Sequence, residues 1–296
     1  MSLMAAQPER SEAATKQADP GRGPGLEAAT APHRPSLADW FGGTSWSAKA
    51  FRLVLSFGLA AAVWEVVARY FVTNRLILVP FSEVLTALVQ EVTTGQLWVH
   101  ARVTLLEIAI AFPMAVVIGM ALGLVIASSR VVQQVLDPLL TAAYSVPIVA
   151  LAPLFVAWLG FGVESKVAII LLVAVFPIVI NTEVGLRSTD AGLIEAARSF
   201  NATRWQVFRT VSLPFAIPFI IGGMRVAFTR TLVGVVVAEF FGAFAGFGYV
   251  ILSASQTYAT ARLLGYVVLL AILGMVSSIA LRAWEARLAP WREVRE

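Results

Sequence analysis

The chain has 296 residues, of which 58% are hydrophobic and 14% charged, and its formal net charge is +4. Soluble domains are roughly half apolar and a quarter charged, so this balance indicates an integral membrane protein. With no cysteine, disulfides and thiolate metal sites are excluded, and the two histidines, His33 and His100, have no suitably spaced carboxylates for a metal site. Both histidines are expected to be solvated. The basic balance reflects membrane topology, and no nucleic-acid partner is expected.

Residues 1–48 are rich in Ala, Pro, Gly and Glu and have almost no bulky apolar side chains before Trp40. Such a segment cannot bury a core, so we expect a disordered cytoplasmic tail. It is not a signal peptide, because no apolar run follows its charges. The aromatic and basic residues between Trp40 and Arg52 predict an interfacial segment that leads into the first span.

Apolar runs long enough to cross a bilayer, which takes about twenty residues, occur six times along the chain. They lie at about 53–72, 103–127, 137–159, 166–186, 215–241 and 263–284. The sequence therefore predicts an all-α polytopic membrane domain over 49–284 with six transmembrane helices, followed by a cytoplasmic tail at 285–296. A short amphipathic helix is expected at 82–92, and a glycine-rich turn is expected between the fifth and sixth spans.

The Lys and Arg residues are distributed unevenly between the two sides of these spans. With the N-terminus inside, the external side holds only Arg69, Arg75, Arg102, Lys166 and Arg262. The remaining basic residues that flank the spans fall on the other side. Because cytoplasmic loops carry the excess of positive charge, we expect both termini and the segment 190–213 to be cytoplasmic.

The segment 190–213 is polar and basic, and it carries helix start and stop signals. Asp190 is a candidate N-cap for a first helix, and an apolar stripe from Leu193 to Phe200 follows at helical spacing. Asn201, one of the few non-glycine residues that tolerate a left-handed conformation, ends this helix. Thr203 and Gln206 form a capping box that starts a second helix. The segment is thus either a helical hairpin built for docking or an ordinary amphipathic loop.

The spacing in this hairpin resembles the EAA loop of ABC importer permeases. Glu195-Ala196-Ala197, three residues, Asn201, nine residues, Val211, one residue and Leu213-Pro214 follow that family's pattern. Val211 replaces isoleucine and Asn201 replaces glycine. Asn can supply the positive backbone angle that the glycine provides. The replacement of glycine by Asn201 therefore affects how tight the turn is and leaves the identity of the loop unchanged.

Further stretches resemble permeases of the nitrate, sulfonate, taurine and bicarbonate branch of that family. They are LDPLL at 136–140, SVPIVALAPLFVAWLGFG at 145–162, SKVAII at 165–170, FPIVINT at 176–182 and AEFFGAFAGFGY at 238–249. The resemblance implies a type I importer fold with a second permease subunit, a cytoplasmic ABC ATPase dimer and an extracytoplasmic solute-binding protein. A single copy of the motif favours a homodimer, and a related second permease chain is the alternative.

By the same resemblance, the hairpin contacts the ATPase. The residues expected at that contact are Glu195, Ala196, Ala197, Asn201, Arg204 and Trp205. A Walker A loop, G-x-x-x-x-G-K-[ST], is absent from the sequence, as are G-x-S-x-G and H-E-x-x-H. We therefore expect no enzymatic activity and no cofactor in this chain, with ATP and Mg²⁺ bound by the partner.

Charged and polar residues inside the spans are candidates for the translocation path. Arg225 and Arg230 are expected near and beyond the middle of the membrane, where a guanidinium either attracts an anion or pairs with a carboxylate such as Glu239 or Glu107. Glu239 either closes a gate or reaches headgroup water.

Prolines interrupt several of the spans and suit helices that line a cavity. Tyr144 and Ser145, beside Pro147, either line the path or satisfy backbone groups freed by a kink. The glycines near these prolines, including Gly222 and Gly223, fit close helix packing equally well.

The expected function is import of a small anion such as nitrate, bicarbonate, a sulfonate or taurine. A thiamine-precursor-like nitrogen compound is the alternative within the same importer class. A secondary transporter without an ATPase is the alternative outside it, but internal repeats and a buried acidic relay, which that class favours, are not seen. A structural anchor would not need prolines in its spans.

Overall fold

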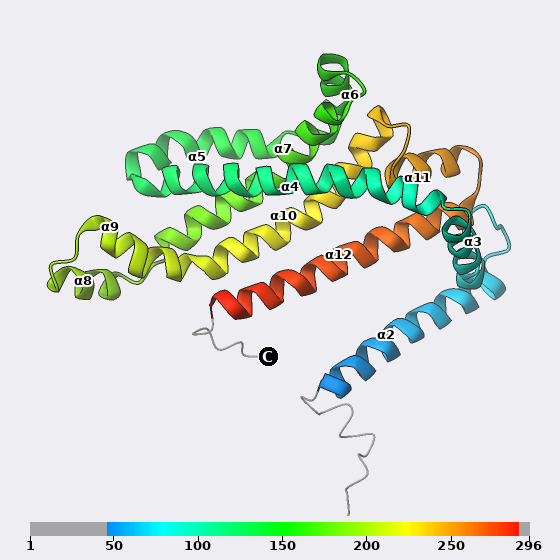
Figure 1. The fold of residues 1–296 in the computed structure, drawn as a ribbon, viewed down its shortest axis with the longest axis horizontal. Coiled ribbons are helices and arrows are strands. Elements are labelled where there is room, and N and C mark those ends of the chain that lie inside the picture. The colour runs from blue at the N-terminus through cyan, green and yellow to red at the C-terminus, as the bar shows by residue number, and fades with distance from the viewer. Residues whose placement is uncertain (1–45, 290–296) are drawn as a thin grey trace, which may run out of the picture. The chain divides into compact units, whose positions relative to one another are not determined.

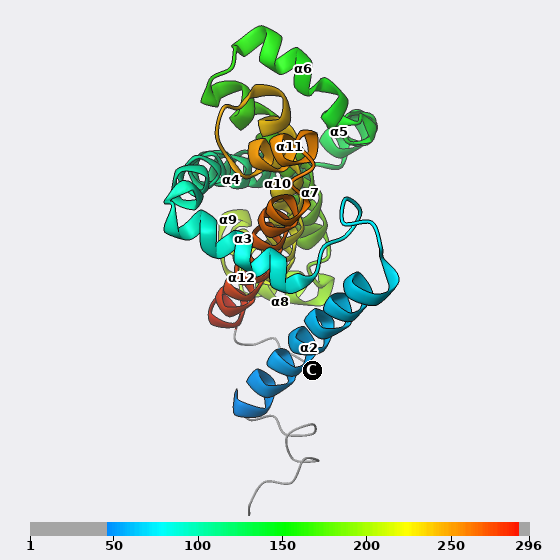
Figure 2. The ribbon, with the colours of Figure 1, turned by 90° about the vertical axis from the view of Figure 1, so that its right-hand side faces the viewer.

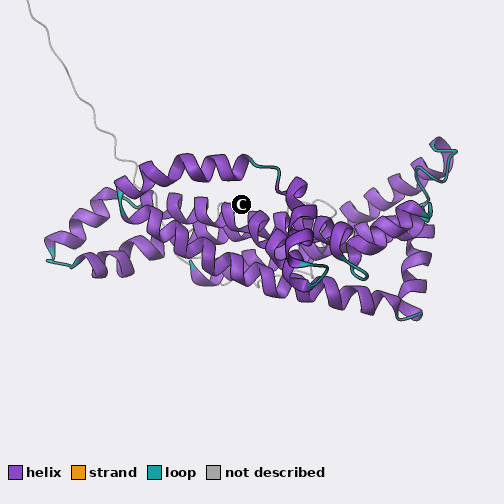
Figure 3. Cartoon of the chain, turned by 90° about the horizontal axis from the view of Figure 1, so that it is seen from above, coloured by secondary structure: helices purple, strands orange, loops and turns teal. Residues whose placement is uncertain are grey.

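The computed structural model describes residues 46–289, and its regular elements are helices joined by short loops (Figures 1 and 3). The elements are α2 (Trp46–Val66), η1 (Val67–Phe71), α3 (Phe81–Thr93), α4 (Gln96–Ser128), α5 (Arg130–Ser145), α6 (Ile148–Leu159), α7 (Val163–Arg187), α8 (Ala191–Ser199), α9 (Arg204–Val207), η2 (Phe208–Ser212), α10 (Leu213–Gly242), α11 (Phe247–Gln256) and α12 (Thr260–Leu288). η1 and η2 are single π-helical turns. Most of the predicted N-terminal tail and the last residues of the C-terminal tail lie outside the described residues.

The chain divides into two units, Met1–Gly58 and Leu59–Glu296, and α2 runs across the boundary between them. The second unit contains the helices from α3 to α12. Its first residues belong to the end of α2, where Trp64 Nε1 donates a hydrogen bond to Val79 O over 3.0 Å. All the packing described below lies within this second unit.

The all-α membrane architecture predicted from the sequence is confirmed in the described part of the chain. There, single helical stretches long and apolar enough to cross a membrane cover Phe51–Phe71, Gln96–Ser128, Val163–Arg187, Arg204–Gly242 and Thr260–Leu288. The third predicted span, 137–159, is not one straight helix. It is divided between α5 and α6, whose axes are bent by 86° (Figure 1).

The bend between α5 and α6 follows from Pro147. A proline disfavours helical angles at the residue before it, and Val146 accordingly has extended angles, with φ −69° and ψ 128°. Pro147 also lacks the N–H that would continue the hydrogen-bond ladder. The break predicted beside Tyr144 and Ser145 is therefore confirmed, and it divides the predicted span 137–159 between α5 and α6.

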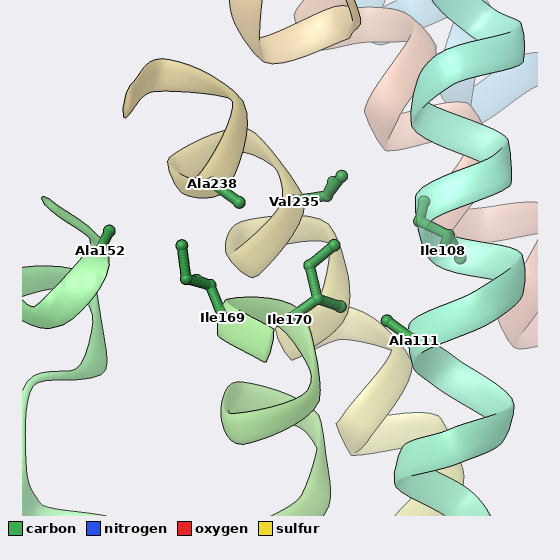
Figure 4. Close-up of a cluster of buried hydrophobic side chains, with 7 residues drawn as sticks. All are labelled: Ile108, Ala111, Ala152, Ile169, Ile170, Val235 and Ala238. Atoms are coloured by element: carbon green, nitrogen blue, oxygen red, sulfur yellow. The ribbon is translucent and has the colours of Figure 1, made fainter. Parts of the chain in front are cut away.

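Helices α4, α7 and α10 run side by side through the centre of the second unit (Figures 1 and 2). Buried aliphatic side chains from these helices and from α6 meet in one cluster, which Figure 4 shows. Its members are Ile108, Ala111, Ala152, Ile169, Ile170, Val235 and Ala238. Because many of these residues are alanine or branched aliphatics, the helices approach closely and their contacts rely on packing.

Three glycines show how close the helices come. A Cβ on Gly119 would lie 2.8 Å from Ile178 Cβ, and one on Gly123 would lie 2.6 Å from Thr182 Cβ. On α10, a Cβ on Gly223 would lie 2.6 Å from Asn181 Cβ of α7. Small residues at such contacts let membrane helices approach closely, so the packing interpretation of these glycines is confirmed.

Gly222 and Gly223 form a natural test of this packing. Gly222→Ala should raise the free energy of unfolding by about 0.5–1 kcal/mol, because alanine favours the helix and, among the described residues, no neighbouring element lies within 4 Å of the added Cβ. Gly223→Ala should lower it by about 1–3 kcal/mol, because the methyl group would overlap Asn181. Denaturant titration of both variants in mixed micelles measures the difference, and equal behaviour of the two neighbours would contradict it.

The amphipathic helix predicted at 82–92 is confirmed as α3, and polar contacts attach it to α12. Glu91 near the end of α3 forms an ion pair with Arg262 Nε at 2.8 Å. The Tyr266 hydroxyl of α12 donates to Glu91 Oε2 over 2.7 Å. At the same end of α12, the aromatic rings of Tyr266 and Phe247 of α11 contact edge to face. These contacts connect α3, α11 and α12 at the end of the bundle far from α8 and α9.

Candidate functional site

The predicted helical hairpin is present and lies at the end of the bundle where α7 ends and α10 begins (Figure 1). Its first helix, α8, begins as the sequence predicts. The Asp190 side chain accepts a hydrogen bond from Leu193 N over 3.1 Å and so caps the helix. The N-cap prediction is confirmed.

The turn between the two hairpin helices depends on Asn201, whose φ is +57°. Asn201 N donates to Arg198 O over 2.8 Å, and Ala202 N donates to Ala197 O over 3.2 Å, which satisfies the last carbonyls of α8. The left-handed conformation predicted for Asn201 is therefore confirmed. The asparagine takes the backbone angle that glycine takes in the family pattern.

The second helix of the hairpin starts with the predicted capping box. Gln206 N donates to Thr203 Oγ1 over 3.3 Å, and Thr203 N donates to Gln206 Oε1 over 2.8 Å. The helix α9 then continues through the π turn η2 into α10, so that Arg204–Gly242 is one helical stretch of 39 residues. At 1.5 Å per residue it is about 58 Å long. The hairpin is thus continuous with a candidate membrane span.

Large apolar side chains on the hairpin lie on its surface. Phe200 is 87% exposed, Trp205 66% and Leu193 52%. The ring of Trp205 stacks on Phe208, with 5.4 Å between the centroids. We call Leu193, Phe200 and Trp205 the hairpin patch. Exposed apolar groups on one capped turn are typical of a protein-docking surface.

The other residues predicted for docking lie on the same hairpin. Glu195, Ala196 and Arg204 are exposed, whereas Ala197 is partly buried. Ser199 Oγ donates to the backbone oxygen of Glu195 over 3.0 Å. The exposed docking residues are therefore available to a partner, and the sequence prediction that they act there remains a prediction.

The residues predicted for the translocation path do not come together in one site. Arg225 forms an ion pair with Glu285 of α12, with Nη2 2.6 Å from Oε2, and not with Glu239 or Glu107. Glu285 lies in the last turn of α12, and the depth of Arg225 in the membrane stays a prediction. Arg230 is exposed on the surface of the chain.

At the bend between α5 and α6, Tyr144 is 42% exposed and its ring lies 5.8 Å from that of Phe176. The Ser145 hydroxyl donates to Thr141 O over 2.7 Å, which is the backbone role that the sequence left open. These observations give Ser145 a structural partner inside its own helix. A contact of Tyr144 with solute stays a prediction.

Glu239 differs most from its prediction. It is 1% exposed, so the expectation that it reaches headgroup water is wrong. Its carboxylate accepts hydrogen bonds from Thr104 Oγ1 over 2.7 Å and from Gly248 N. Glu239 thereby attaches α10 to α4 and to the turn that leads into α11.

His100 and Glu107 of α4 are also buried, so the expectation that His100 is solvated is wrong. His100 is 6% exposed, and its Nδ1 accepts a hydrogen bond from Gly246 N over 3.2 Å. Glu107 is fully buried and forms an ion pair with Lys166 of α7, with Nζ 2.6 Å from Oε1. We call Glu107, Lys166, Glu239, Thr104 and His100 the buried polar cluster.

Sequence reasoning missed this cluster because it considered Glu107 and Glu239 singly, as possible partners of an arginine in α10. The available signal was that Glu107 and Glu239 lie within predicted apolar runs, where a charge requires a partner. Among the described residues, no three His, Cys, Asp or Glu side chains are grouped so as to hold a metal ion. The cluster therefore consists of hydrogen bonds and charge pairs.

Comparison with known proteins identifies the family. Residues 115–294 match the model of the binding-protein-dependent transport system inner membrane component. The chain is 33% identical over 236 residues to the putative aliphatic sulfonates transport permease SsuC of Bacillus subtilis, covering 79% of this chain and 85% of that protein. It is 33% identical to the taurine transport permease TauC of Escherichia coli, covering 81% and 90%.

A third relative is the formylaminopyrimidine transport permease ThiX of Halalkalibacterium halodurans, which is 30% identical and covers 83% of this chain and 98% of that protein. Among solved structures, an inward-facing conformation of the MetNI methionine ABC transporter matches with a TM-score of 0.57, covering 66% of this chain and 95% of that chain at 21% identity. That likeness shows the fold. The chain belongs to the family of binding-protein-dependent transport system inner membrane components, the permease subunits of ABC importers.

Proposed function

We propose that this permease subunit imports a small organic anion of the sulfonate class, driven by a cytoplasmic ATPase that docks on the hairpin of residues 190–213. The hairpin patch is the observation that carries the proposal. Leu193, Phe200 and Trp205 expose apolar surface on a turn whose conformation is fixed by two caps and by Asn201. Burying this patch against a partner removes it from water, which favours association.

The continuity of the hairpin with α10 supports the mechanism. In our proposal, ATP and Mg²⁺ bind between two ATPase subunits and draw them together, and each ATPase subunit moves one docked hairpin. The helical stretch Arg204–Gly242 carries that movement across the membrane. Because a ligand shifts an equilibrium only by its differential affinity, ATP must favour the outward-open state, and hydrolysis lets the inward-open state return.

The substrate class rests on the relatives and on charge. Two of the relatives are named for aliphatic sulfonates and taurine. Arg230 exposes a guanidinium on α10, and a guanidinium suits bidentate hydrogen bonds to the oxygens of a sulfonate. Arg225 is engaged by Glu285, so its use by a solute requires that pair to open.

The second candidate substrate is a formylaminopyrimidine-like compound, favoured by the match that covers nearly all of ThiX. In either case we propose the same assembly. Two copies of this chain form the path, both termini and the hairpin face the cytoplasm, and an external binding protein delivers the solute. The uneven distribution of Lys and Arg supports the orientation.

Uptake into proteoliposomes tests the proposal. The chain is reconstituted with its partner ATPase and binding protein, and entry of labelled taurine is measured with and without ATP. We expect ATP-dependent uptake that excess aliphatic sulfonate suppresses and formylaminopyrimidine does not. The reverse pattern of competition would transfer the assignment to the second candidate, and uptake by the chain alone would overturn the ATP-driven mechanism.

A further inference from the structure

The buried polar cluster joins α4, α7, α10 and the turn before α11, at the end of α10 opposite the hairpin. The rise along α10 from Leu213 to Glu239 is about 39 Å. Three of its ionisable side chains are almost completely enclosed, with Glu107 and Glu239 at 0% and 1% exposure and the Lys166 side chain at 7%.

Glu239 is surrounded by hydrogen-bond donors. Thr104 Oγ1 and Gly248 N donate to its two oxygens, and Phe247 N donates to Thr104 Oγ1 over 2.8 Å. The turn wraps around the carboxylate closely, because a Cβ on Gly246 or Gly248 would overlap the Glu239 side chain. A carboxyl group that accepts from several donors is stabilised in its ionised form.

Glu107 has the opposite surroundings. One oxygen, Oε1, accepts from Lys166 Nζ over 2.6 Å. The other, Oε2, is buried and has no hydrogen-bond partner among the described residues. Glu239, which is itself an acceptor, bonds to Thr104, and Thr104 lies three residues before Glu107 on the same face of α4. Two acceptor oxygens that face each other without a proton repel, and an unsatisfied buried oxygen is costly.

The charges of the cluster do not balance if both carboxyl groups are ionised. Lys166 supplies one positive charge against two negative ones. His100 adds none, because its Nδ1 accepts from Gly246 N and therefore carries no proton. Thr104 and Gly248 are neutral. A net negative charge enclosed among membrane helices is strongly disfavoured.

We propose that the buried polar cluster is a proton-binding site in which Glu107 is held as the neutral acid and donates a hydrogen bond from Oε2 to the Glu239 carboxylate. One proton on Glu107 accounts for both the unpartnered oxygen and the unbalanced charge of the cluster. The unpartnered oxygen becomes a donor, and the net charge of the cluster becomes zero. Lys166 donates to the carbonyl oxygen of Glu107, and its positive charge balances the negative charge of the Glu239 carboxylate. The proton thus adds a hydrogen bond between α4 and α10 beside Lys166 of α7, and it stabilises the turn before α11.

Infrared spectroscopy of the full-length chain in lipid nanodiscs tests the protonation state. We expect an absorption band of a protonated carboxyl group at neutral pH that disappears in Glu107→Gln. The amide of that variant reproduces the proposed hydrogen bonds, since its oxygen accepts from Lys166 and its NH₂ group donates to Glu239. Glu164→Gln is the matched control, because Glu164 is an exposed carboxylate in the first turn of the same helix as Lys166. It should leave the band unchanged.

Thermal unfolding gives a second readout. A folded state that holds a proton which the unfolded state releases loses stability as pH rises, by about a tenfold change in the unfolding constant per pH unit. Wild type and Glu164→Gln should show this loss between neutral and alkaline pH, and Glu107→Gln should lack it while unfolding at a similar temperature at neutral pH. A missing carboxyl band, or a Glu107→Gln variant as unstable as Glu107→Ala, would overturn the proposal.

Discussion

Glu195→Arg is expected to abolish ATP-driven uptake while leaving the chain folded and inserted in the membrane. Glu195 is exposed on α8, and the hydrogen bonds that cap the hairpin involve Asp190, Thr203 and Gln206 instead. The substitution should therefore change the free energy of unfolding little. At a docked surface, reversing the charge of a contact residue costs about 2 kcal/mol or more, a loss of roughly 30-fold in affinity.

Two measurements separate docking from folding in this variant. Co-purification of the ATPase with the tagged permease should fall together with uptake, whereas the amount of permease in the membrane should not. Glu164→Arg supplies the control, since it makes the same charge reversal on an exposed carboxylate at the opposite end of α7. If Glu195→Arg retains ATPase and uptake at the level of Glu164→Arg, Glu195 has no part in docking. Deletion of residues 195–201 should have the same effect as Glu195→Arg.

The hairpin could be predicted from the sequence because the interactions that form it are local. Asp190 bonds to Leu193, and Thr203 exchanges two bonds with Gln206, three residues away in each case. The backbone angle at Asn201 follows from the residue type and from its place at a helix end. Each of these signals can be recognised without knowing what lies elsewhere in the chain.

The buried polar cluster could not be predicted in this way, because its contacts join distant parts of the sequence. Lys166 and Glu107 are 59 residues apart, and Thr104 and Glu239 are 135 apart. The pairing of these charges depends on how α4 is aligned along α7 and α10. Hydropathy does not determine that alignment. Sequence reasoning identified Glu239 as a charge within a span but could not predict that its side chain is buried.

The partner of Arg225 could not be predicted for a related reason. The sequence offered Glu239 or Glu107 as its carboxylate, whereas in the structure Arg225 pairs with Glu285 in the last turn of α12, 60 residues away along the chain. Pro147 similarly marked where the third span breaks, but the 86° angle depends on how α6 packs against α7 and α10.

Lys166→Met is expected to lower the free energy of unfolding by about 3–5 kcal/mol, because it removes the only ammonium from the buried polar cluster. Methionine fills a similar volume with an unbranched, flexible chain, so little packing is lost. The loss comes from the carboxylate charge that remains enclosed without a counter-ion. Denaturant titration in mixed micelles measures it.

Arg69→Met is the matched control, since the ion pair of Arg69 with Glu65 has the same 2.6 Å length but an arginine side chain that is 55% exposed. Water screens exposed pairs, so this variant should unfold close to the wild-type denaturant concentration. The double variant Lys166→Met/Glu107→Gln then identifies the carboxylate that Lys166 neutralises. If Glu107 is already the neutral acid, the second substitution restores little stability, because the charge left behind is on Glu239. Restoration of most of the loss would instead place the charge on Glu107, and a Lys166→Met variant as stable as Arg69→Met would show that the enclosed charges need no ammonium.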